Sequence, residues 1–153
     1  MSDIIITGCN NIDLLVFWRI HVLRCVFSIP ENMDTAELEC SNRNYYEQHL
    51  ADNSHIACIA SIENEVIGCG GICFYEEMPS PDNRNGRCAY LMNIYVSEQF
   101  RGQGTAKRIV RWLVGQALAQ GVGKIYLETS DMARQLYGSL GFNYMKNMMR
   151  LEA

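Results

Sequence analysis

The alternation of apolar and polar residues along the chain predicts several short strands. Runs rich in β-branched and apolar residues occur at 4–7, 55–61, 66–75, 87–96, 124–128 and 142–151. Glu63 and Asn64 separate the second run from the third, where they predict the turn of a β-hairpin. The run at 124–128 is expected to be a short buried strand, and the run at 142–151 is expected to form one or two final strands.

Helical spacing of apolar positions predicts helices in other segments. The periodic segments are 13–25, 106–119 and 132–140. Asn10, Asn11 or Asp13 is available to cap the first helix, and Gly121 follows the second. Segment 31–41 is expected to be a loop or a short helix, segment 45–50 one or two helical turns, and the Pro- and Asn-rich segment 78–86 an exposed loop.

The order of these elements predicts an α/β protein. Strands come first and then alternate with helices, which indicates one domain over residues 1–153 with a mixed sheet. A length of 153 residues suits a single domain. Because 48% of the residues are hydrophobic and only 3 are proline, intrinsic disorder is excluded.

Charge and cysteine usage narrow the class of protein. A net charge of -4 argues against a nucleic-acid-binding protein. No apolar run approaches the roughly 20 residues that span a bilayer, and the start Met1-Ser2-Asp3 has no feature of a signal peptide. The 7 cysteines contain no Cys-x-x-Cys pair, so no metal site is expected. These features predict a cytoplasmic protein with reduced thiols and no membrane contact.

Segment 101–106, Arg-Gly-Gln-Gly-Thr-Ala, carries the clearest functional signal. It follows a strand and precedes a long helix, and its glycines let backbone N–H groups approach a ligand closely. The first turn of a helix also presents the positive end of the helix dipole. This arrangement predicts a binding site for an anion, most often a phosphate.

The charge pattern around this segment supports an anionic ligand. No Asp or Glu occurs from Gln99 to Leu127. The same stretch contains five basic residues, which are Arg101, Lys107, Arg108, Arg111 and Lys124. Cations at a helix N-terminus oppose the helix dipole, so a bound anion would offset them. The alternative is a solvated basic face of an ordinary surface helix.

Two common phosphate motifs do not match. A P-loop needs G-x-x-x-x-G-K-[ST], and Gly104 is followed by Thr-Ala-Lys. A dinucleotide fingerprint needs a third glycine where Lys107 stands and a strand directly before Gly102, but five residues intervene. An NTPase or a dinucleotide-binding fold is therefore not favoured.

Two motifs together resemble the GNAT superfamily of N-acetyltransferases. The first is Arg101-x-x-Gly104-x-Ala106 after a strand that ends in Tyr95-Val96, which resembles the loop that binds the pyrophosphate of acyl-CoA. The second is Leu136-Tyr137 with Leu140-Gly141-Phe142. The resemblance implies a central mixed, mostly antiparallel sheet flanked by helices, and acetyl-CoA as the co-substrate.

The resemblance also implies roles for individual residues. Ile94, Tyr95 and Val96 would pair with the pantetheine arm through their backbone groups, as a strand edge pairs with a peptide. The pyrophosphate would be held by Arg101, Gly102, Gln103, Gly104, Thr105 and Ala106. Arg108, or Lys107, would reach the 3'-phosphate or stay solvated. Ser130 stands where the family often has Asn and would bond the end of the pantetheine.

The resemblance makes Tyr137 the candidate general acid. Direct attack of a neutral amine on the thioester leaves a CoA thiolate, which a phenol can protonate. The alternative is a core tyrosine on a short helix. The general base stays open between Glu76, Glu77 and a water relay, and the N–H of Ile94 is a candidate for stabilising the oxyanion.

The acyl acceptor is expected to bind over the N-terminal half of the chain. Asn93, Trp18 and Tyr75 are the candidate contacts, although most aromatic residues of this half also fit a simple core. The expected acceptor is a small-molecule amine. A CoA-binding module without catalysis and a nucleotide-binding domain are the alternative functions, and a homodimer through an edge strand stays open.

Overall fold

Five strands form one sheet in the computed structural model, which describes residues 2–153. The strands are β1 (Ile5–Gly8), β2 (His55–Ile62), β3 (Glu65–Glu76), β4 (Arg87–Val96) and β5 (Lys124–Leu127), and they lie in that order across the sheet. Neighbouring strands are antiparallel except β4 and β5, which are parallel. The predicted mixed, mostly antiparallel sheet is confirmed.

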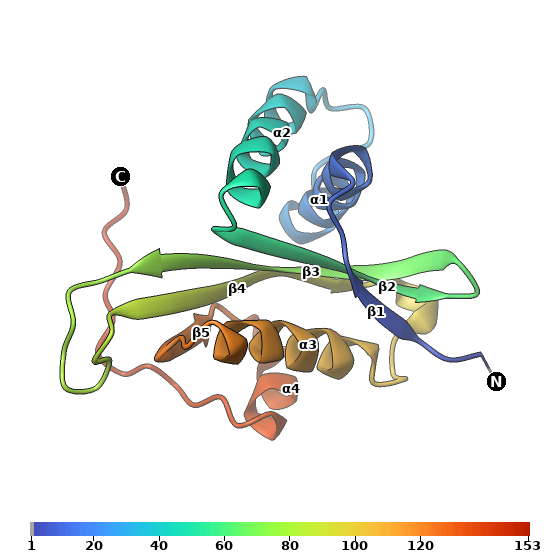
Figure 1. Ribbon diagram of the computed structural model, residues 1–153. Helices are drawn as coiled ribbons and strands as arrows, with labels where there is room; N and C mark the ends of the chain where they lie inside the picture. The colour runs from blue at the N-terminus through green and yellow to red at the C-terminus, as the bar shows by residue number, and fades with distance from the viewer. Residues whose placement is uncertain (1) are drawn as a thin grey trace.

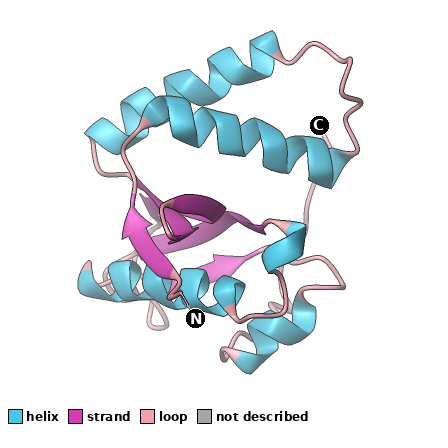
Figure 2. Cartoon of the chain, turned by 90° about the vertical axis from the view of Figure 1, so that its right-hand side faces the viewer, coloured by secondary structure: helices cyan, strands magenta, loops and turns pink. Residues whose placement is uncertain are grey.

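Helices cover both faces of this sheet (Figure 1). The helices α1 (Ile12–Phe27) and α2 (Ala36–Ala51) lie on one face, whereas α3 (Thr105–Ala119) lies on the other. The short helix α4 (Arg134–Ser139) lies on the α3 side, and Figure 2 shows the same layers from the side. A single 3-10 turn, Glu98–Phe100, connects β4 to the glycine-containing segment before α3.

The main core lies between α3 and the sheet. Ile109 and Leu113 of α3 are fully buried, as are Ile67 and Ile72 of β3. The spacing of buried residues on α3 is that of one helical face, as the sequence predicts. A second set of buried side chains, led by Leu15 and Tyr46, joins α1 and α2 to the other face.

A helix cap and a hairpin turn in the N-terminal half form as the sequence predicts. Asn11 caps α1 by accepting a hydrogen bond from the N–H of Leu14 at 3.1 Å. Glu63 and Asn64 both have positive φ angles, 47° and 70°, which is the backbone that a two-residue hairpin turn needs. The predicted hairpin of β2 and β3 is confirmed.

Three expectations for individual segments are corrected in part. Segments 31–41 and 45–50 are not separate pieces, because residues from Ala36 onward form the single 16-residue helix α2. The strand at 124–128 is half-buried and ends at Leu127. The loop 78–86 is not wholly exposed, because Asn83 is 3% exposed and its amide donates to the carbonyl of Arg87 at 3.2 Å.

The final strands expected at 142–151 are also absent. This segment forms no backbone ladder, and within residues 2–153 the outer edge of β5 has no strand beside it. A strand needs a ladder partner, and this segment is held by side chains instead: Arg150 pairs with Glu128 at 2.9 Å, and the guanidinium of Arg134 lies 5.2 Å from the ring centre of Tyr144.

Candidate functional site

The strand β4 separates from β5 halfway along its length. The two strands pair only from Cys88 to Leu91, opposite Lys124 to Leu127. Beyond Leu91, the β4 edge that faces β5 has no strand partner within the described chain. Its opposite edge stays paired with β3, up to Gly68 opposite Val96. Except for the carbonyls of Asn93 and Val96, which accept from the side chains of Cys69 and Arg101, the backbone groups on this edge of residues 92–96 are therefore open to an extended ligand.

A β-bulge lies where this open edge begins. The register shifts so that Asn93 and Ile94 stand opposite Gly70 alone, and Asn93 has a φ of 58°. Gly70 is required there, because a Cβ would lie 2.5 Å from the side chain of Ile109 on α3. The bulge thus turns the backbone of β4 while α3 stays packed beneath it.

The segment before α3 forms a turn that depends on two glycines. Gly102 and Gly104 have φ angles of 78° and 80°, and no atom lies within 4 Å of the Cβ that either could carry. These glycines therefore serve the backbone conformation rather than close packing. The N–H of Arg108 donates to the carbonyl of Gly104, so the preceding N–H groups of the first turn lack helical partners. They are available to an anion.

Arg101 fixes this turn to the end of β4. Its Nε donates to the carbonyl of Val96 at 2.9 Å, and its guanidinium lies 5.4 Å from the ring centre of Tyr95. The side chain of Arg101 is thereby committed to the protein, and the carbonyl of Val96 is already engaged. The ligand contacts expected from the turn are consequently those of its backbone.

Most cations of this region have no carboxylate partner. Lys124 pairs with Glu77 at 3.1 Å, and this contact lowers the pKa of Glu77. Within residues 2–153, no ion pair involves Arg101, Lys107, Arg108 or Arg111. Four positive charges around the start of α3 are therefore available to balance an anionic ligand.

This geometry suits a ligand with two parts. The open edge of residues 92–96 can pair with an extended, amide-containing arm, and the start of α3 can hold a phosphate group. In agreement with this arrangement, the family model of the acetyltransferase (GNAT) family matches residues 21–142. The chain belongs to the GNAT family.

Acetyltransferases resemble this chain in sequence and in fold. N-acetyltransferase 8B of Rattus norvegicus is 31% identical over 128 residues, covering 82% of this chain and 50% of the rat protein. A predicted acetyltransferase from Clostridium acetobutylicum, solved with acetyl-CoA, has a TM-score of 0.84 and 28% identity, covering 99% of this chain and 96% of that one. The chain spans about half the length of the curated relatives it matches.

An aminoglycoside N-acetyltransferase AAC(6')-Iy in complex with CoA shares the fold. Its TM-score is 0.75 at 15% identity, and the match covers 100% of this chain and 96% of that chain. At this identity the likeness concerns the fold alone. The family match and the Clostridium structure together confirm the expected family and fold class.

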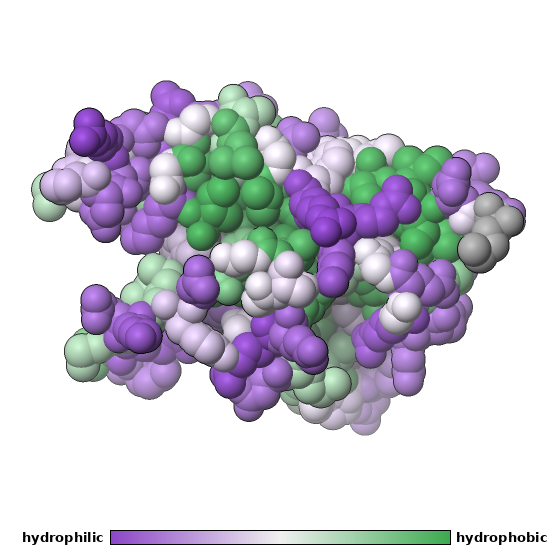
Figure 3. All heavy atoms as spheres, turned by 90° about the horizontal axis from the view of Figure 1, so that it is seen from below, coloured by the Kyte–Doolittle hydropathy of each residue, from purple (hydrophilic) through white to green (hydrophobic). Residues whose placement is uncertain are grey.

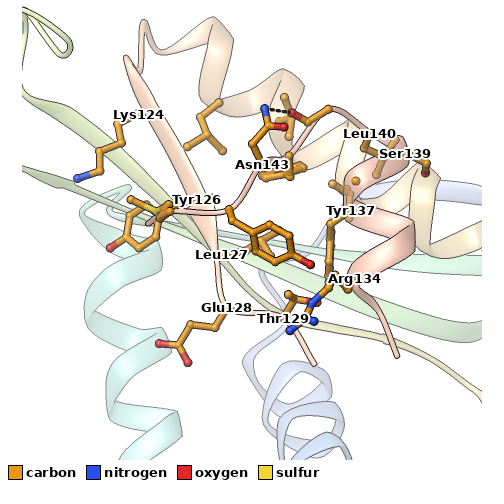
Figure 4. Close-up of a pocket in the computed structure, with 18 of the residues that line it drawn as sticks. Lys124, Tyr126, Leu127, Glu128, Thr129, Arg134, Tyr137, Ser139, Leu140 and Asn143 are labelled. Carbon is orange, nitrogen blue, oxygen red and sulfur yellow. Dashed lines mark hydrogen bonds between the residues drawn. The ribbon is translucent and has the colours of Figure 1, made fainter. Parts of the chain in front are cut away.

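Tyr137 lines a large cavity of this GNAT chain. The cavity has a volume of about 1010 Å³ and lies between α3, β5, α4 and residues 141–148. Figure 4 shows Tyr137 on one side of β5 and Tyr126 with Glu128 on the other. Seen from below, the face that carries α3 and α4 exposes apolar side chains bordered by hydrophilic ones (Figure 3).

The environment of Tyr137 keeps its phenol protonated. Its side chain is 9% exposed and packs edge-on against Phe142, with ring centres 5.9 Å apart. Burial raises the pKa of Tyr137 above its usual value of 10.0. Its hydroxyl makes no hydrogen bond to any residue from 2 to 153. A protonated hydroxyl without a protein partner is able to act as a general acid.

The other predicted site residues have varied surroundings. Ser130 is exposed, and its Oγ accepts from the N–H of Ala133 at 3.3 Å at the turn before α4. Tyr75 is 40% exposed and shares a 2.6 Å hydrogen bond with the hydroxyl of Tyr126. Trp18 is 7% exposed and packs against Cys69 and Val22, so its ring is part of the core.

A polar cluster between α1, α2 and β4 is a feature that the sequence reasoning missed. Arg19 donates from Nη1 to Oδ1 of Asn93 at 3.1 Å, and from Nε to Oδ1 of Asn42 at 3.3 Å. One signal was present in the sequence. Leu15 and Leu23, one turn before and after Arg19, are both apolar and buried, so Arg19 falls on the buried stripe of α1.

A buried histidine lies on the same face of the sheet. His55 is 4% exposed, and its Nδ1 lies 2.8 Å from the hydroxyl of Tyr45. The pKa of His55 is lowered to about 4, chiefly by burial and to a smaller extent by the charges of His49 and Arg19. His55 is consequently neutral at physiological pH.

The two candidate bases at the end of β3 differ in their surroundings. Glu77 is occupied by Lys124, whereas Glu76 is exposed. Within residues 2–153, no group of three metal-ligating side chains occurs, and none of the described helices is long and apolar enough to cross a membrane.

Proposed function

We propose that this chain transfers the acetyl group of acetyl-CoA to the amine of a small molecule. The observation that carries the proposal is the open edge of β4 at residues 92–96, which ends beside the glycine turn of α3. An extended pantetheine arm matches such an edge, and its pyrophosphate matches free N–H groups at a helix start. Family membership and the acetyl-CoA of the Clostridium structure point the same way.

Backbone groups carry most of the proposed binding. Ile94 and Tyr95 pair with the arm, and the N–H groups from Gly102 to Ala106 surround the pyrophosphate. Arg108 lies on the exposed side of the first turn of α3, where it reaches the 3'-phosphate. The N–H of Ile94, the second residue of the bulge, is the proposed donor to the oxygen of the thioester carbonyl as negative charge develops on it.

Tyr137 is the proposed general acid. The neutral amine attacks the thioester carbonyl and forms the C–N bond, and the C–S bond then breaks. The departing sulfur takes the proton of the Tyr137 hydroxyl, and the phenol recovers a proton from water or from the amine nitrogen. The raised pKa of Tyr137 favours this role because the hydroxyl stays protonated at neutral pH.

The binding half of the proposal is tested by thermal unfolding with added ligand. Acetyl-CoA and CoA at about 100 times their Kd stabilise the folded state by roughly 2.7 kcal/mol, which raises Tm by several degrees. NAD and ATP at the same concentration serve as controls for a nucleotide-binding domain. A shift with ATP or NAD and none with acetyl-CoA would overturn the proposal.

The catalytic half is tested with Tyr137→Phe. This change removes one hydroxyl from a buried ring, so kcat with any accepted amine is expected to fall by about a hundredfold to ten thousandfold. The acetyl-CoA-induced shift in Tm is expected to stay as in the wild type. Turnover at the wild-type rate would show that Tyr137 is a packing residue, and binding without turnover on any amine would indicate a CoA-binding module.

A further inference from the structure

Arg19 is a cation held at the inner side of a helix. It lies on α1 between two buried leucines, and its side chain is only partly exposed. Water cannot fully surround a guanidinium in that position, so the charge carries a desolvation cost. Such a group is normally paired with an anion.

The protein supplies Arg19 with neutral partners only. Its two hydrogen bonds go to the side-chain oxygens of Asn42 and Asn93. The Nδ2 of Asn93 donates to the sulfur of Cys69 at 3.7 Å and the Nδ2 of Asn42 to the carbonyl of Leu38 at 2.9 Å, which orients both amide oxygens toward Arg19. Within residues 2–153, Arg19 takes part in no ion pair, and its Nη2 makes no hydrogen bond.

Three acidic groups at the ends of α1 and α2 have other partners. Asp13 pairs with Arg43 at 2.8 Å. Asp52 accepts from the N–H and the hydroxyl of Ser54, and Glu39 accepts from the hydroxyl of Thr35. The charge of Arg19 lowers the pKa of Tyr45, Tyr46, His55 and Cys69, none of which is an anion at neutral pH.

The position of Arg19 ties it to the reacting end of the proposed ligand. Asn93, its partner, is the bulge residue at the start of the open edge of β4, so Arg19 is one side chain away from that edge. It approaches from the α1 and α2 face, opposite α3 (Figure 1). Arg19 thus lies one hydrogen bond from the strand residue that precedes Ile94, the proposed donor to the thioester carbonyl.

We infer that Arg19 binds a carboxylate of the acceptor, so that the acceptor is an amine that also carries a carboxylate, such as an amino acid. The Nη1 and Nη2 atoms form a planar edge that matches the two oxygens of a carboxylate. A single guanidinium balances one negative charge, which favours a carboxylate over a phosphate dianion. The inference rests on the proposed acetyl transfer and specifies its acceptor.

The first test compares acceptors that differ only in the carboxylate. Amino acids are assayed as acceptors by the release of the CoA thiol from acetyl-CoA. Each amino acid is compared with its carboxamide and with its decarboxylated amine. Phosphoethanolamine is included as an amine that carries a phosphate instead of a carboxylate. The wild type is expected to prefer the best amino acid over its carboxamide by about tenfold or more in kcat/KM. Equal use of acid and amide, or preference for phosphoethanolamine, would overturn the inference.

The second test changes the guanidinium. Arg19→Gln is expected to raise KM for the amino acid by about tenfold or more, with kcat and the carboxamide reaction within about threefold of wild type. Arg19→Lys restores part of the preference because it restores the charge. Arg43→Gln is the matched control, since it removes a guanidinium that already has a carboxylate partner. Equal losses for acid and amide would show that Arg19 only joins α1, α2 and β4.

A binding measurement separates this inference from the proposed function. N-acetylated amino acids and their carboxamides are titrated calorimetrically into the CoA-bound protein, whose folding is checked by Tm for each variant. Tighter binding of the acid, lost in Arg19→Gln, supports the carboxylate site even if turnover is absent. Failure of every amine to react would count against acetyl transfer, whereas equal binding of acid and carboxamide would count against Arg19.

Discussion

The two faces of the sheet are built for two different kinds of recognition. On the α3 face, the core is apolar and the proposed ligand contacts are backbone groups at the open edge of β4 and at the turn before α3. On the α1 and α2 face, polar side chains such as Arg19, Asn93 and His55 lie among the apolar ones. Backbone geometry suits a ligand of constant structure, whereas side chains can be exchanged to select among acceptors.

Acid is expected to weaken the α1 and α2 face, and this is the largest effect we predict for stability. The folded protein keeps His55 neutral down to about pH 4, whereas in the unfolded chain it takes up a proton below about pH 6.5. Between these values the unfolded state binds more protons, so the free energy of unfolding falls as the pH falls. His55 thereby lowers the free energy of unfolding at pH 4 by about 3 kcal/mol relative to pH 7.

Urea unfolding at pH 7 and pH 4.5 measures this contribution. In His55→Gln the difference between the two pH values is expected to shrink, because the group that titrates is gone. Tyr45→Phe is the control, since it removes the hydrogen bond at Nδ1 but keeps the buried imidazole. If His55→Gln and the wild type lose the same free energy on acidification, the imidazole is not held neutral by the fold.

The α3 side was the more predictable of the two from sequence. Glycines at 102 and 104 and the absence of acids from 99 to 127 are local signals, and they require no knowledge of what lies across the sheet. The bounds of β4, from Arg87 to Val96, follow from its β-branched and aromatic residues. The open edge itself is not a local property, because it depends on where β5 ends.

The opposite face depended on contacts that the sequence does not display. The helix α2 has a weak apolar pattern, and only Tyr46 is buried on it, so the polar residues around Cys40 to Asn44 suggested a break. Thr35 stands at its N-cap without a side-chain capping bond, and Asp34 just before it accepts from the N–H of Ala36. For residues 142–151 the opposite holds: the sequence has a strand-like pattern, but the segment pairs with no strand of the sheet.

A methyl group at the glycine turn is expected to affect the α3 face selectively. Gly104→Ala places a Cβ at a φ of 80° in open space, so its cost of about 1–2 kcal/mol is backbone strain alone. The backbone relieves that strain by moving the N–H groups of the turn. The Kd for acetyl-CoA is therefore expected to rise by about tenfold. Calorimetric titration measures this change. Acceptor preference should not change.

Gly115→Ala is the matched control for this change. Gly115 also has open space around its Cβ position, but it lies inside α3, where alanine is the better helix former. The variant is expected to gain about 0.5–1 kcal/mol of stability and to bind acetyl-CoA as the wild type does. Weaker binding in Gly115→Ala as well would mean that α3 as a whole, rather than its first turn, determines affinity.

The smallest effect that we expect concerns CoA binding, and it distinguishes a cation near α3 that has a carboxylate partner from one that has none. Arg108 has no carboxylate partner within the described residues. Arg108→Gln is therefore expected to weaken CoA binding by up to about tenfold. The binding of dephospho-CoA should not change, because only CoA carries the 3'-phosphate.

Lys124→Gln is the control, because it removes a cation that Glu77 already neutralises. The two side chains of this pair are each 33% exposed. Its expected cost is below about 1 kcal/mol of stability, with no change in Kd for either ligand. Both variants are titrated with CoA and with dephospho-CoA. A loss of CoA affinity in Arg108→Gln alone indicates a specific contact with the 3'-phosphate. A loss in Lys124→Gln as well would indicate that the basic face attracts the anionic ligand in general.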